Sequence, residues 1–242
     1  MPIGKVYLIP ANLYNDEKAL QALPAYITDA IKDCDIFFAE NERIARRYFK
    51  KLWKARLPGK EMVIDNYVWY TIHNAEENVR SAFIQHLKEE KNIGIISEAG
   101  CPGIADPGQI LVNAAQQLHA KIIPLVGPSS ILLALMASGM NGQCFQFKGY
   151  LPIESAERKK ILKELEADSA KRNCTQIFIE TPYRNNQLIN DVLKVCKPET
   201  LFCIAADITA LTEYIQTKTI NEWKNKIPDM NKRPAIFLLY VQ

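Results

Sequence analysis

The chain has 242 residues, of which 48% are apolar and 24% charged, and its formal net charge is +3 at pH 7. This length corresponds to one large domain or two small ones with a buried core. The mild charge excludes a chain that is basic throughout, so any site for a polyanion must be local. No signal peptide or membrane-spanning run is recognisable, which predicts a cytoplasmic protein.

The cysteines and histidines do not form a metal-ligand pattern. The two nearest cysteines are Cys196 and Cys203, so the chain has no CxxC pair. The three histidines are scattered along the sequence. We expect the six cysteines to be reduced, mostly buried thiols, and we expect no bound metal.

Short apolar runs alternate with amphipathic stretches in the first part of the chain. The pattern predicts strands at residues 6–9, 36–39, 62–64, 93–97 and 122–125, and helices at residues 18–32, 42–53, 76–90, 109–118 and 129–137. Such alternation is typical of βαβ units and predicts a mainly parallel sheet with helices on both faces. Ligands bind these sheets outside the carboxyl ends of the strands.

The pattern changes after SGMNGQC, residues 138–144, where glycine and asparagine cluster. Strands are predicted at residues 145–149, 175–180, 201–206, 213–219 and 235–241, and helices at residues 154–168 and 187–195. A strand-rich ending favours a mixed sheet. We therefore predict two α/β domains, at residues 1–142 and 143–242, with a ligand cleft between them.

The stretch SEAGCPGIADPG, residues 97–108, holds three glycines and two prolines directly after a predicted strand. Glycines let the main chain approach a ligand closely, and prolines stiffen the loop. Such a loop suits a ligand with a polar rim, for example a nucleoside or an amino acid moiety. The alternative is a plain turn in which Asp106 caps the next helix, and for Asp106 alone the two interpretations are equally good.

Two further loops follow predicted strands. PLVGPSS, residues 124–130, is either a second backbone-rich ligand loop or a helix cap supplied by Ser129 or Ser130. IETPYR, residues 179–184, is either a site loop carrying Glu180 or a helix start with Pro182 in its first turn. No Walker A or GxGxxG motif is present, which argues against an ATPase or a dinucleotide-binding protein.

The segment NERIARRYFKKLWKARLPGK, residues 41–60, concentrates eight basic residues against one acidic residue. Spacing places Arg43, Arg47, Lys50 and Lys54 on one face of the predicted helix, with aromatic residues interleaved. The pattern is either a solvated face over buried aromatics or the footprint of a polyanion such as RNA.

Taken together, these stretches resemble the class III, tetrapyrrole-methylase-like methyltransferases that use S-adenosylmethionine (SAM). SEAGCPGIADPG is similar to the family signature SDAGTPGISDPG, PLVGPSSILLALMASGM to PGPSAxxxALxASGL, and FIETPYR to FYESPHR. The match extends in order over nearly the whole chain. Within the family, the chain is most similar to the branch of ribosomal RNA small-subunit methyltransferase I, which methylates a cytidine ribose 2′-oxygen.

The resemblance implies two α/β domains with SAM in the cleft between them, and a homodimer. It also implies which positions line the cofactor pocket, with main-chain groups of Ile104 and Ala105 at the methionine part and second-domain residues near the adenine. The implied cofactor residues are Pro10, Asn12, Glu98, Ala99, Gly100, Cys101, Pro102, Ile104, Ala105, Asp106, Ser129, Ser130, Thr181, Ala206, Pro234 and Ala235.

The same resemblance implies ribosomal RNA or the small ribosomal subunit as the partner. The basic residues expected to bind RNA are Arg43, Arg46, Arg47, Lys50 and Lys54. A ribose hydroxyl is a poor nucleophile, so a carboxylate at the cleft would help to align and deprotonate it. The candidate catalytic residues are Glu98, Asp106 and Glu40.

The substrate-side motifs depart from the family pattern. Glu98 stands where the signature has Asp, and the family's EDTR is here Glu40-Asn41-Glu42-Arg43. Two alternatives therefore stay open: SAM-dependent methylation of a tetrapyrrole or other small molecule, and a non-catalytic RNA-binding relative of the methylases. An unrelated nucleotide-binding α/β protein is disfavoured by the glycine-rich loop, and the basic segment argues mildly against a small-molecule substrate.

Overall fold

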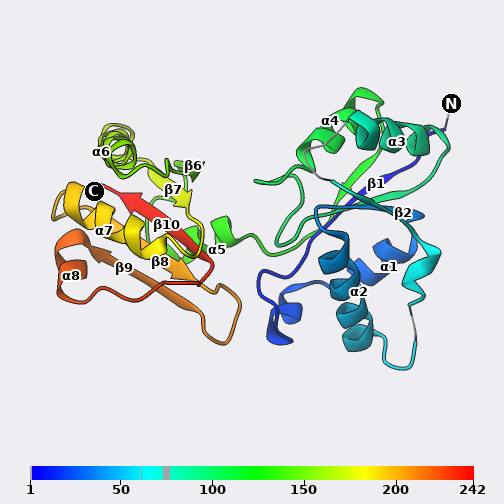
Figure 1. Ribbon diagram of the computed structural model, residues 1–242, viewed down its shortest axis with the longest axis horizontal. Helices are drawn as coiled ribbons and strands as arrows, with labels where there is room; N and C mark the ends of the chain where they lie inside the picture. Colours follow the sequence, from blue (N-terminus) through cyan, green and yellow to red (C-terminus); the bar gives the residue numbers. More distant parts are fainter. Residues whose placement is uncertain (1, 61, 73–76) are drawn as a thin grey trace. The chain divides into compact units, whose positions relative to one another are not determined.

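The computed structural model describes residues 2–60, 62–72 and 77–242. Contacts within the chain divide it into two compact units, residues 1–129 and 130–242. Each unit contains one five-stranded sheet, and the chain can be followed through both units in Figure 1. In the part of the chain that is described, no helix is long and apolar enough to cross a membrane.

The sheet of the first unit is parallel throughout, as predicted. Its strands lie in the order β3 (Val68–Thr71), β2 (Ile36–Ala39), β4 (Ile93–Ile96), β1 (Val6–Ile9) and β5 (Ile122–Pro124). The connecting helices are η1 (Lys18–Ala22), α1 (Ile27–Lys32), α2 (Glu42–Arg56), η2 (Ile64–Asn66), α3 (Glu77–Lys88) and α4 (Gln109–Gln117).

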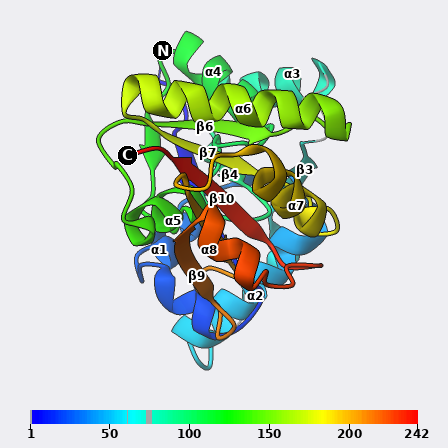
Figure 2. The ribbon, with the colours of Figure 1, turned by 90° about the vertical axis from the view of Figure 1, so that its left-hand side faces the viewer.

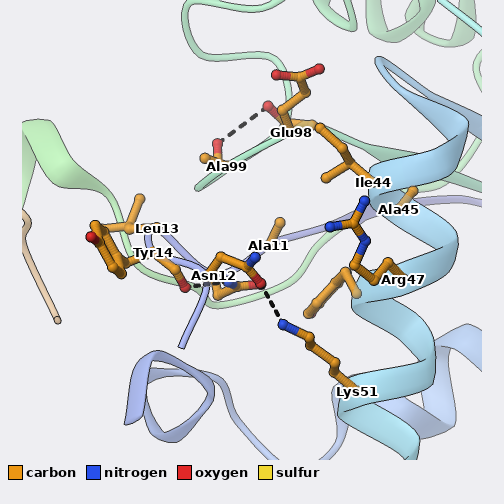
Figure 3. A pocket seen from close by; sticks show the side chains of 13 residues that line it. Ala11, Asn12, Leu13, Tyr14, Ile44, Ala45, Arg47, Lys51, Glu98 and Ala99 are labelled. Carbon is orange, nitrogen blue, oxygen red and sulfur yellow. Dashed lines mark hydrogen bonds between the residues drawn. The ribbon is translucent and has the colours of Figure 1, made fainter. Parts of the chain in front are cut away.

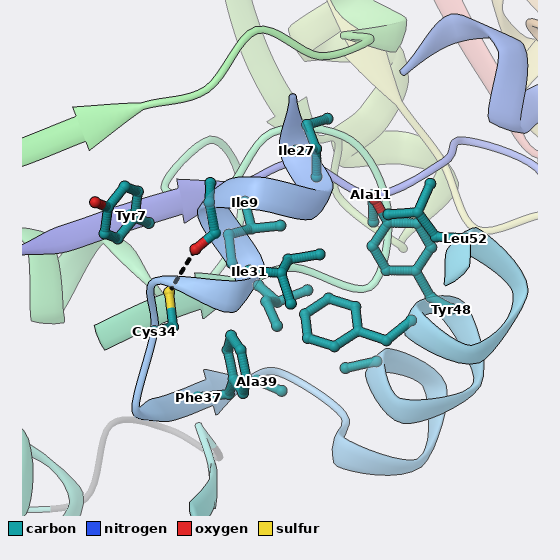
Figure 4. Close-up of a cluster of buried hydrophobic side chains, with 14 of the residues drawn as sticks. Tyr7, Ile9, Ala11, Ile27, Ile31, Cys34, Phe37, Ala39, Tyr48 and Leu52 are labelled. Atoms are coloured by element: carbon teal, nitrogen blue, oxygen red, sulfur yellow. Dashed lines mark hydrogen bonds between the residues drawn. The ribbon is translucent and has the colours of Figure 1, made fainter. Parts of the chain in front are cut away.

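Helices cover both faces of this sheet because successive strand residues point to opposite sides. In β2, Phe37 packs into a buried cluster with residues of α1 and α2, including Ile31 and Phe49. Its neighbour Phe38 packs into a second cluster with Phe83 of α3 and residues of α4. Figure 4 shows part of the first cluster, with Phe37, Ile31 and Leu52 between the strands and helices.

Two predictions in this unit were wrong in detail. The predicted helix at residues 18–32 is broken into η1 and α1, because Pro24 lacks a backbone N–H and forces Leu23 into an extended conformation. The third strand lies at Val68–Thr71 rather than at residues 62–64. Trp69 and Tyr70 of this strand stack on the two phenylalanines of β2. The predicted start of the helix at residue 76 lies outside the described residues.

The sheet of the second unit is mixed, as predicted. Its order is β6 (Phe145–Tyr150), β7 (Thr175–Ile179), β10 (Ala235–Tyr240), β8 (Leu201–Ala206) and β9 (Tyr214–Thr219). Only β6 and β7 are parallel, and the other neighbours are antiparallel. The helices are α5 (Ser130–Ser138), α6 (Ser155–Arg172), α7 (Asn185–Val195) and α8 (Ile220–Asn225).

One face of the second sheet carries a core of aromatic and aliphatic side chains beneath three helices. Phe178, Phe202 and Phe237 form its centre, and residues of α6, α7 and α8 pack on them. Figure 2 turns this unit toward the viewer and shows the three helices in front of the strands. The short helix α8 was not predicted, although Thr219 and Glu222 form a capping box at its start.

The contacts divide the chain before α5, whereas the predicted boundary follows it. Helix α5 packs against β9 and β10 of the second unit. The glycine-rich turn after α5 is tied to the same unit, since Thr217 Oγ1 donates to the carbonyl of Ser138 and Thr175 Oγ1 donates to that of Asn141. Glycines at residues 139 and 142 therefore mark a tight turn inside the second unit.

Candidate functional site

The predicted ligand loops of the first unit meet at the carboxyl edge of its parallel sheet. Ala11, just after β1, and Gly100, after β4, form an isolated antiparallel bridge. Their two main-chain hydrogen bonds measure 2.8 and 3.1 Å. The structure therefore brings Pro10 and Asn12 beside the loop of residues 97–108, at the edge where α/β sheets bind ligands.

Asp106 holds the glycine-rich loop from inside. Its Oδ1 accepts hydrogen bonds from the N–H groups of Gly103, at 2.9 Å, and Gly108, at 2.8 Å, and Oδ2 lies 3.0 Å from the Gly103 nitrogen. Burial raises the pKa of the Asp106 carboxyl above its usual value, although the two N–H groups act in the opposite direction. The carboxylate thus faces its own loop, which is the geometry of a positioning residue.

The outer surface of the same loop consists of main chain. Gly100, Gly103 and Ala105 have φ angles of +74°, +82° and +60°, a region that glycine adopts freely and alanine only under strain. Ile104 and Ala105 are exposed. Their N–H groups donate no hydrogen bond within the described chain. The loop thus offers main-chain donors to a ligand, as the resemblance implies for the methionine part of SAM.

Glu40 and Glu98 differ in how far their carboxylates are engaged. Glu40 Oε2 accepts from Ser97 Oγ at 3.3 Å and from the Glu98 N–H at 3.0 Å, which ties the end of β2 to the end of β4. The Glu98 side chain is exposed. Its carboxylate has no hydrogen-bond or ion-pair partner among the described residues. Of the three predicted catalytic carboxylates, Glu98 is the one open to a substrate.

The loop after β5 packs tightly against the other two loops. Cys101 Sγ lies 3.7 Å from the carbonyl oxygen of Gly127 and 3.5 Å from that of Pro128. Burial raises the pKa of this thiol, so it is not a reactive thiolate. Ser129 ends the first unit, and Ser130 begins α5 in the second.

Replacing Gly127 by alanine is expected to destabilise the first unit by about 1–3 kcal/mol through overpacking. A Cβ at this position would lie 2.1 Å from the Cβ of Pro10 and 2.5 Å from its Cγ. The proline ring is buried and cannot rotate away. Thermal unfolding measures the loss. Gly142→Ala is the control, because a Cβ there meets nothing within 4 Å. Equal melting temperatures for the two variants would contradict the packing argument.

A pocket of about 330 Å³ opens beside the glycine-rich loop. It is lined by three segments: the residues after β1, residues 44–51 of α2 and the first residues after β4. Figure 3 shows Asn12 and Tyr14 on one side, Arg47 and Lys51 on α2, and Glu98 at the far rim. Every residue that lines this pocket belongs to the first unit.

The basic residues of α2 are not equivalent. Arg46 is paired with Glu42 at 2.8 Å and with Asp65, and it lies over the Trp69 ring. The hydrogen bond that Arg46 donates to Glu42, together with the charge of Asp65, raises the pKa of the Arg46 guanidinium. By contrast, the other four predicted RNA-binding residues are exposed and form no ion pair within the described chain: Arg43, Arg47, Lys50 and Lys54.

The interleaved aromatic residues of α2 are buried in the core. Tyr48, Phe49 and Trp53 are at most 6% exposed. These aromatic rings are therefore not available for stacking on bases. Of the pattern that predicted polyanion binding, only the basic side chains face solvent. A surface groove of about 500 Å³ runs along these charges, lined by Glu42, Arg43, Arg46, Arg47 and Lys50.

The predicted residues of the second unit also converge, at one edge of their own sheet. Because β10 runs antiparallel to β7 and β8, its start lies beside their ends: Ala235 pairs with Ala206, and Ile236 with Ile179. The N–H of Asp207 donates to the Pro234 carbonyl at 3.0 Å. Thr181, Ala206, Pro234 and Ala235 thus share this edge.

Sequence reasoning missed a polar cluster beside this edge. Asp207 is 5% exposed, accepts from Arg233 Nε at 2.8 Å and from Thr212 Oγ1 at 3.0 Å, and keeps a buried Oδ1 without a partner in the described chain. Asp207 and Thr209 both have positive φ angles, 50° and 75°. Strained polar residues after a strand are typical of functional loops. The signal in the sequence was the Asp and Thr of AADITALTE.

The fold is that of a class of two-unit α/β methyltransferases. The methyltransferase CobJ superposes with a TM-score of 0.63 at 15% identity, covering 98% of this chain and 94% of that chain. A uroporphyrin-III C-methyl transferase from Thermus thermophilus, complexed with S-adenyl homocysteine, gives 0.54 at 14% identity, covering 98% and 97%. Residues 23–223 match the model of the Tetrapyrrole (Corrin/Porphyrin) Methylases, and the chain belongs to this family.

Several curated relatives that match this chain are named "Ribosomal RNA small subunit methyltransferase I". The protein from Vibrio cholerae is 35% identical over 170 residues, which span 70% of this chain and 57% of that protein. The protein from Bacillus subtilis is 30% identical over 93% of this chain and 71% of its own length. The protein from Escherichia coli O157:H7 is 27% identical over 99% of this chain and 78% of its own length. These matches confirm the family resemblance seen in the motifs.

Proposed function

We propose that this chain transfers a methyl group from SAM to a ribose 2′-hydroxyl of small-subunit ribosomal RNA. The observation that carries the proposal is the glycine-rich loop, in which Ile104 and Ala105 are exposed and their N–H groups donate no hydrogen bond within the described chain, while Asp106 holds the flanking Gly103 and Gly108. A binding loop of main-chain groups, without a phosphate-binding motif, suits SAM because SAM carries no phosphate. The name of the curated relatives supports ribosomal RNA as the acceptor.

When bound, SAM supplies an electrophilic methyl group on a sulfonium. The 2′-oxygen–carbon bond forms as the sulfur–carbon bond breaks, and the hydroxyl proton must leave. Glu98 is the residue that we propose as the proton acceptor, since its carboxylate is exposed and unpartnered in the described chain. Glu40 and Asp106 position the loop, because their oxygens accept main-chain N–H groups.

The remaining predicted residues take binding roles in this proposal. Thr181, Ala206 and the segment of Pro234 and Ala235 bind the adenine, while Arg43 and its exposed basic neighbours bind RNA phosphates. We also propose that the protein acts in the cytoplasm as a homodimer. Highly exposed apolar side chains such as Met136 and Leu211 support a protein contact, and sedimentation of the purified chain tests it.

The experiment offers methyl-labelled SAM together with small ribosomal subunits from cells that lack this methylation. We expect label in the ribosomal RNA, at a site resistant to alkaline cleavage, and SAM binding by calorimetry. Glu98→Gln removes the proposed proton acceptor and is therefore expected to lower kcat about 100-fold. The affinity of this variant for SAM is expected to stay within about twofold of the parent. Label in an added tetrapyrrole but not in RNA would replace the proposal, and absence of SAM binding would overturn it.

A further inference from the structure

The pocket beside the glycine-rich loop contains two cations that the fold itself does not neutralise. Arg47 and Lys51 are one helical turn apart on α2, so they project from the same face. Both side chains are exposed, and neither forms an ion pair within the described residues. Lys51 Nζ donates to Asn15 Oδ1 at 2.6 Å, which holds the ammonium toward the segment after β1.

The contrast with the preceding residue makes this arrangement specific. The Arg46 guanidinium forms ion pairs with Glu42 and Asp65. Arg47 has the same side chain one position further on, and it lines the pocket instead. Two adjacent cations without a protein anion repel each other in the free protein, so an anion bound between them gains from both.

The floor and the opposite wall of the pocket suit a flat aromatic group. Ile44, Ala45 and Leu13 supply apolar surface, and Tyr14 is half-buried at the side. Asn12 Nδ2 donates to the Tyr14 carbonyl, which fixes the turn that carries this ring. Tyr48 beneath is buried, with its hydroxyl donating to the Pro10 carbonyl at 2.8 Å, so the floor is rigid.

The size and position of the pocket decide the ligand class. About 330 Å³ lies at the lower end of the roughly 300–1,000 Å³ range for small-molecule sites, room for one nucleoside and too little for a four-ring macrocycle. Ser97, Glu98 and Ala99, the start of the glycine-rich loop, form its rim. A group in the pocket therefore lies beside Glu98, the residue proposed as the proton acceptor.

From these contacts we propose that the pocket binds one unstacked nucleotide of the acceptor RNA, with Arg47 and Lys51 binding its phosphate and Tyr14 stacking on its base. This inference rests on the proposed function and adds the residues that recognise the acceptor. Unstacked bases held on an aromatic ring, with the backbone phosphate on basic side chains, are a common mode of RNA recognition. Arg47 is among the basic residues expected to bind RNA, whereas Lys51 is not, and the sequence alone does not place either of them beside Tyr14.

The test compares two double variants with equal changes of charge. R47Q/K51Q removes the pocket cations. K91Q/K121Q removes two exposed lysines that precede β4 and β5, at the amino-terminal edge of the same sheet. Initial rates of methyl transfer to unmethylated small subunits are measured over a range of salt concentrations, and the affinity for SAM is measured by calorimetry.

We expect R47Q/K51Q to raise KM for the subunit at least about tenfold and to reduce the slope of log kcat/KM against log salt by about one per removed cation. The affinity for SAM and the melting temperature stay unchanged, and K91Q/K121Q behaves like the parent. If R47Q/K51Q keeps the parental KM and salt slope while the parent methylates RNA, the pocket assignment is overturned. If the parent binds SAM but does not methylate RNA, the proposed function fails first. Stronger methylation of a polycarboxylated tetrapyrrole than of RNA would also overturn the assignment.

Discussion

Replacing Asp191 by alanine is expected to lower the free energy of unfolding of the second unit by about 3–5 kcal/mol, because it leaves a buried guanidinium unpaired. The side chains of Arg158 and Asp191 are 2% and 7% exposed. Arg158 Nε donates to Asp191 Oδ2 at 3.0 Å, and its Nη1 donates to the carbonyls of Pro152 and Ile153. The pair therefore ties α6, α7 and the segment before α6 together.

Urea unfolding measures this loss of stability. Hydrogen exchange at the amides of β7 and β10 shows that the loss lies within the second unit. The control is Asp168→Ala, which removes the partner of Arg172 at 3.9 Å on the exposed side of α6 and is expected to cost less than about 1 kcal/mol. R158M/D191L replaces the whole pair by apolar side chains and is expected to recover most of the loss. A D191A variant as stable as the parent would show that the pair contributes nothing.

The same pair predicts a pH dependence that separates the variant from the parent. Burial raises the pKa of the Asp191 carboxyl, but the hydrogen bonds from Arg158 and Ser155 and the charge of Arg158 outweigh it, so the net pKa is lowered. A carboxyl with a lowered pKa stabilises the folded state above its unfolded pKa of about 3.9. This contribution is lost as the pH falls through the lowered value. The stability gap between parent and D191A should narrow on acidification.

Replacing Asp106 by alanine is expected to weaken SAM binding about 10- to 100-fold. Within the described chain, the change removes the acceptor of the N–H groups of Gly103 and Gly108, and hydrogen bonds to a charged group contribute roughly 1.5–3 kcal/mol each. Without these hydrogen bonds, the loop no longer holds Ala105 in its strained conformation. The loop then populates other conformations, and the apparent Kd rises as the competent fraction falls. Calorimetric titration with SAM measures the effect.

Asp106→Asn separates the positioning role from a role in proton transfer. Oδ1 accepts from both N–H groups, so an amide oxygen in its place keeps one hydrogen bond to each, while the contact of Oδ2 with the Gly103 nitrogen at 3.0 Å is lost. We expect D106N to bind SAM within a few-fold of the parent and to keep most of its kcat. A normal affinity for SAM combined with a kcat at least about 100-fold lower would instead assign Asp106 to the chemistry.

Most strands and helices were predictable because their signals are local. The apolar run IFFA at residues 36–39 became β2, and the alternation of such runs with amphipathic stretches was enough to predict the parallel sheet. The third strand was misplaced because VWYT is stabilised by aromatic stacking on residues 37 and 38, a contact that joins segments far apart in the sequence. Helix α5 was assigned to the first domain because apolar periodicity does not say which sheet a helix packs on.

The sequence by itself determined the position of the ligand loops at one edge of the first sheet, because glycine, proline and the end of an apolar run act over a few residues. It also determined the family, through motifs in a constant order. Only the tertiary structure decided which charges are free. Arg46 and Arg47 are identical and adjacent, yet Arg46 meets Asp65 from the segment after α2 while Arg47 lines the pocket. Likewise, Glu40 and Asp106 bind main-chain N–H groups and Glu98 does not. Such partners are brought together by packing between distant segments, which local spacing does not encode.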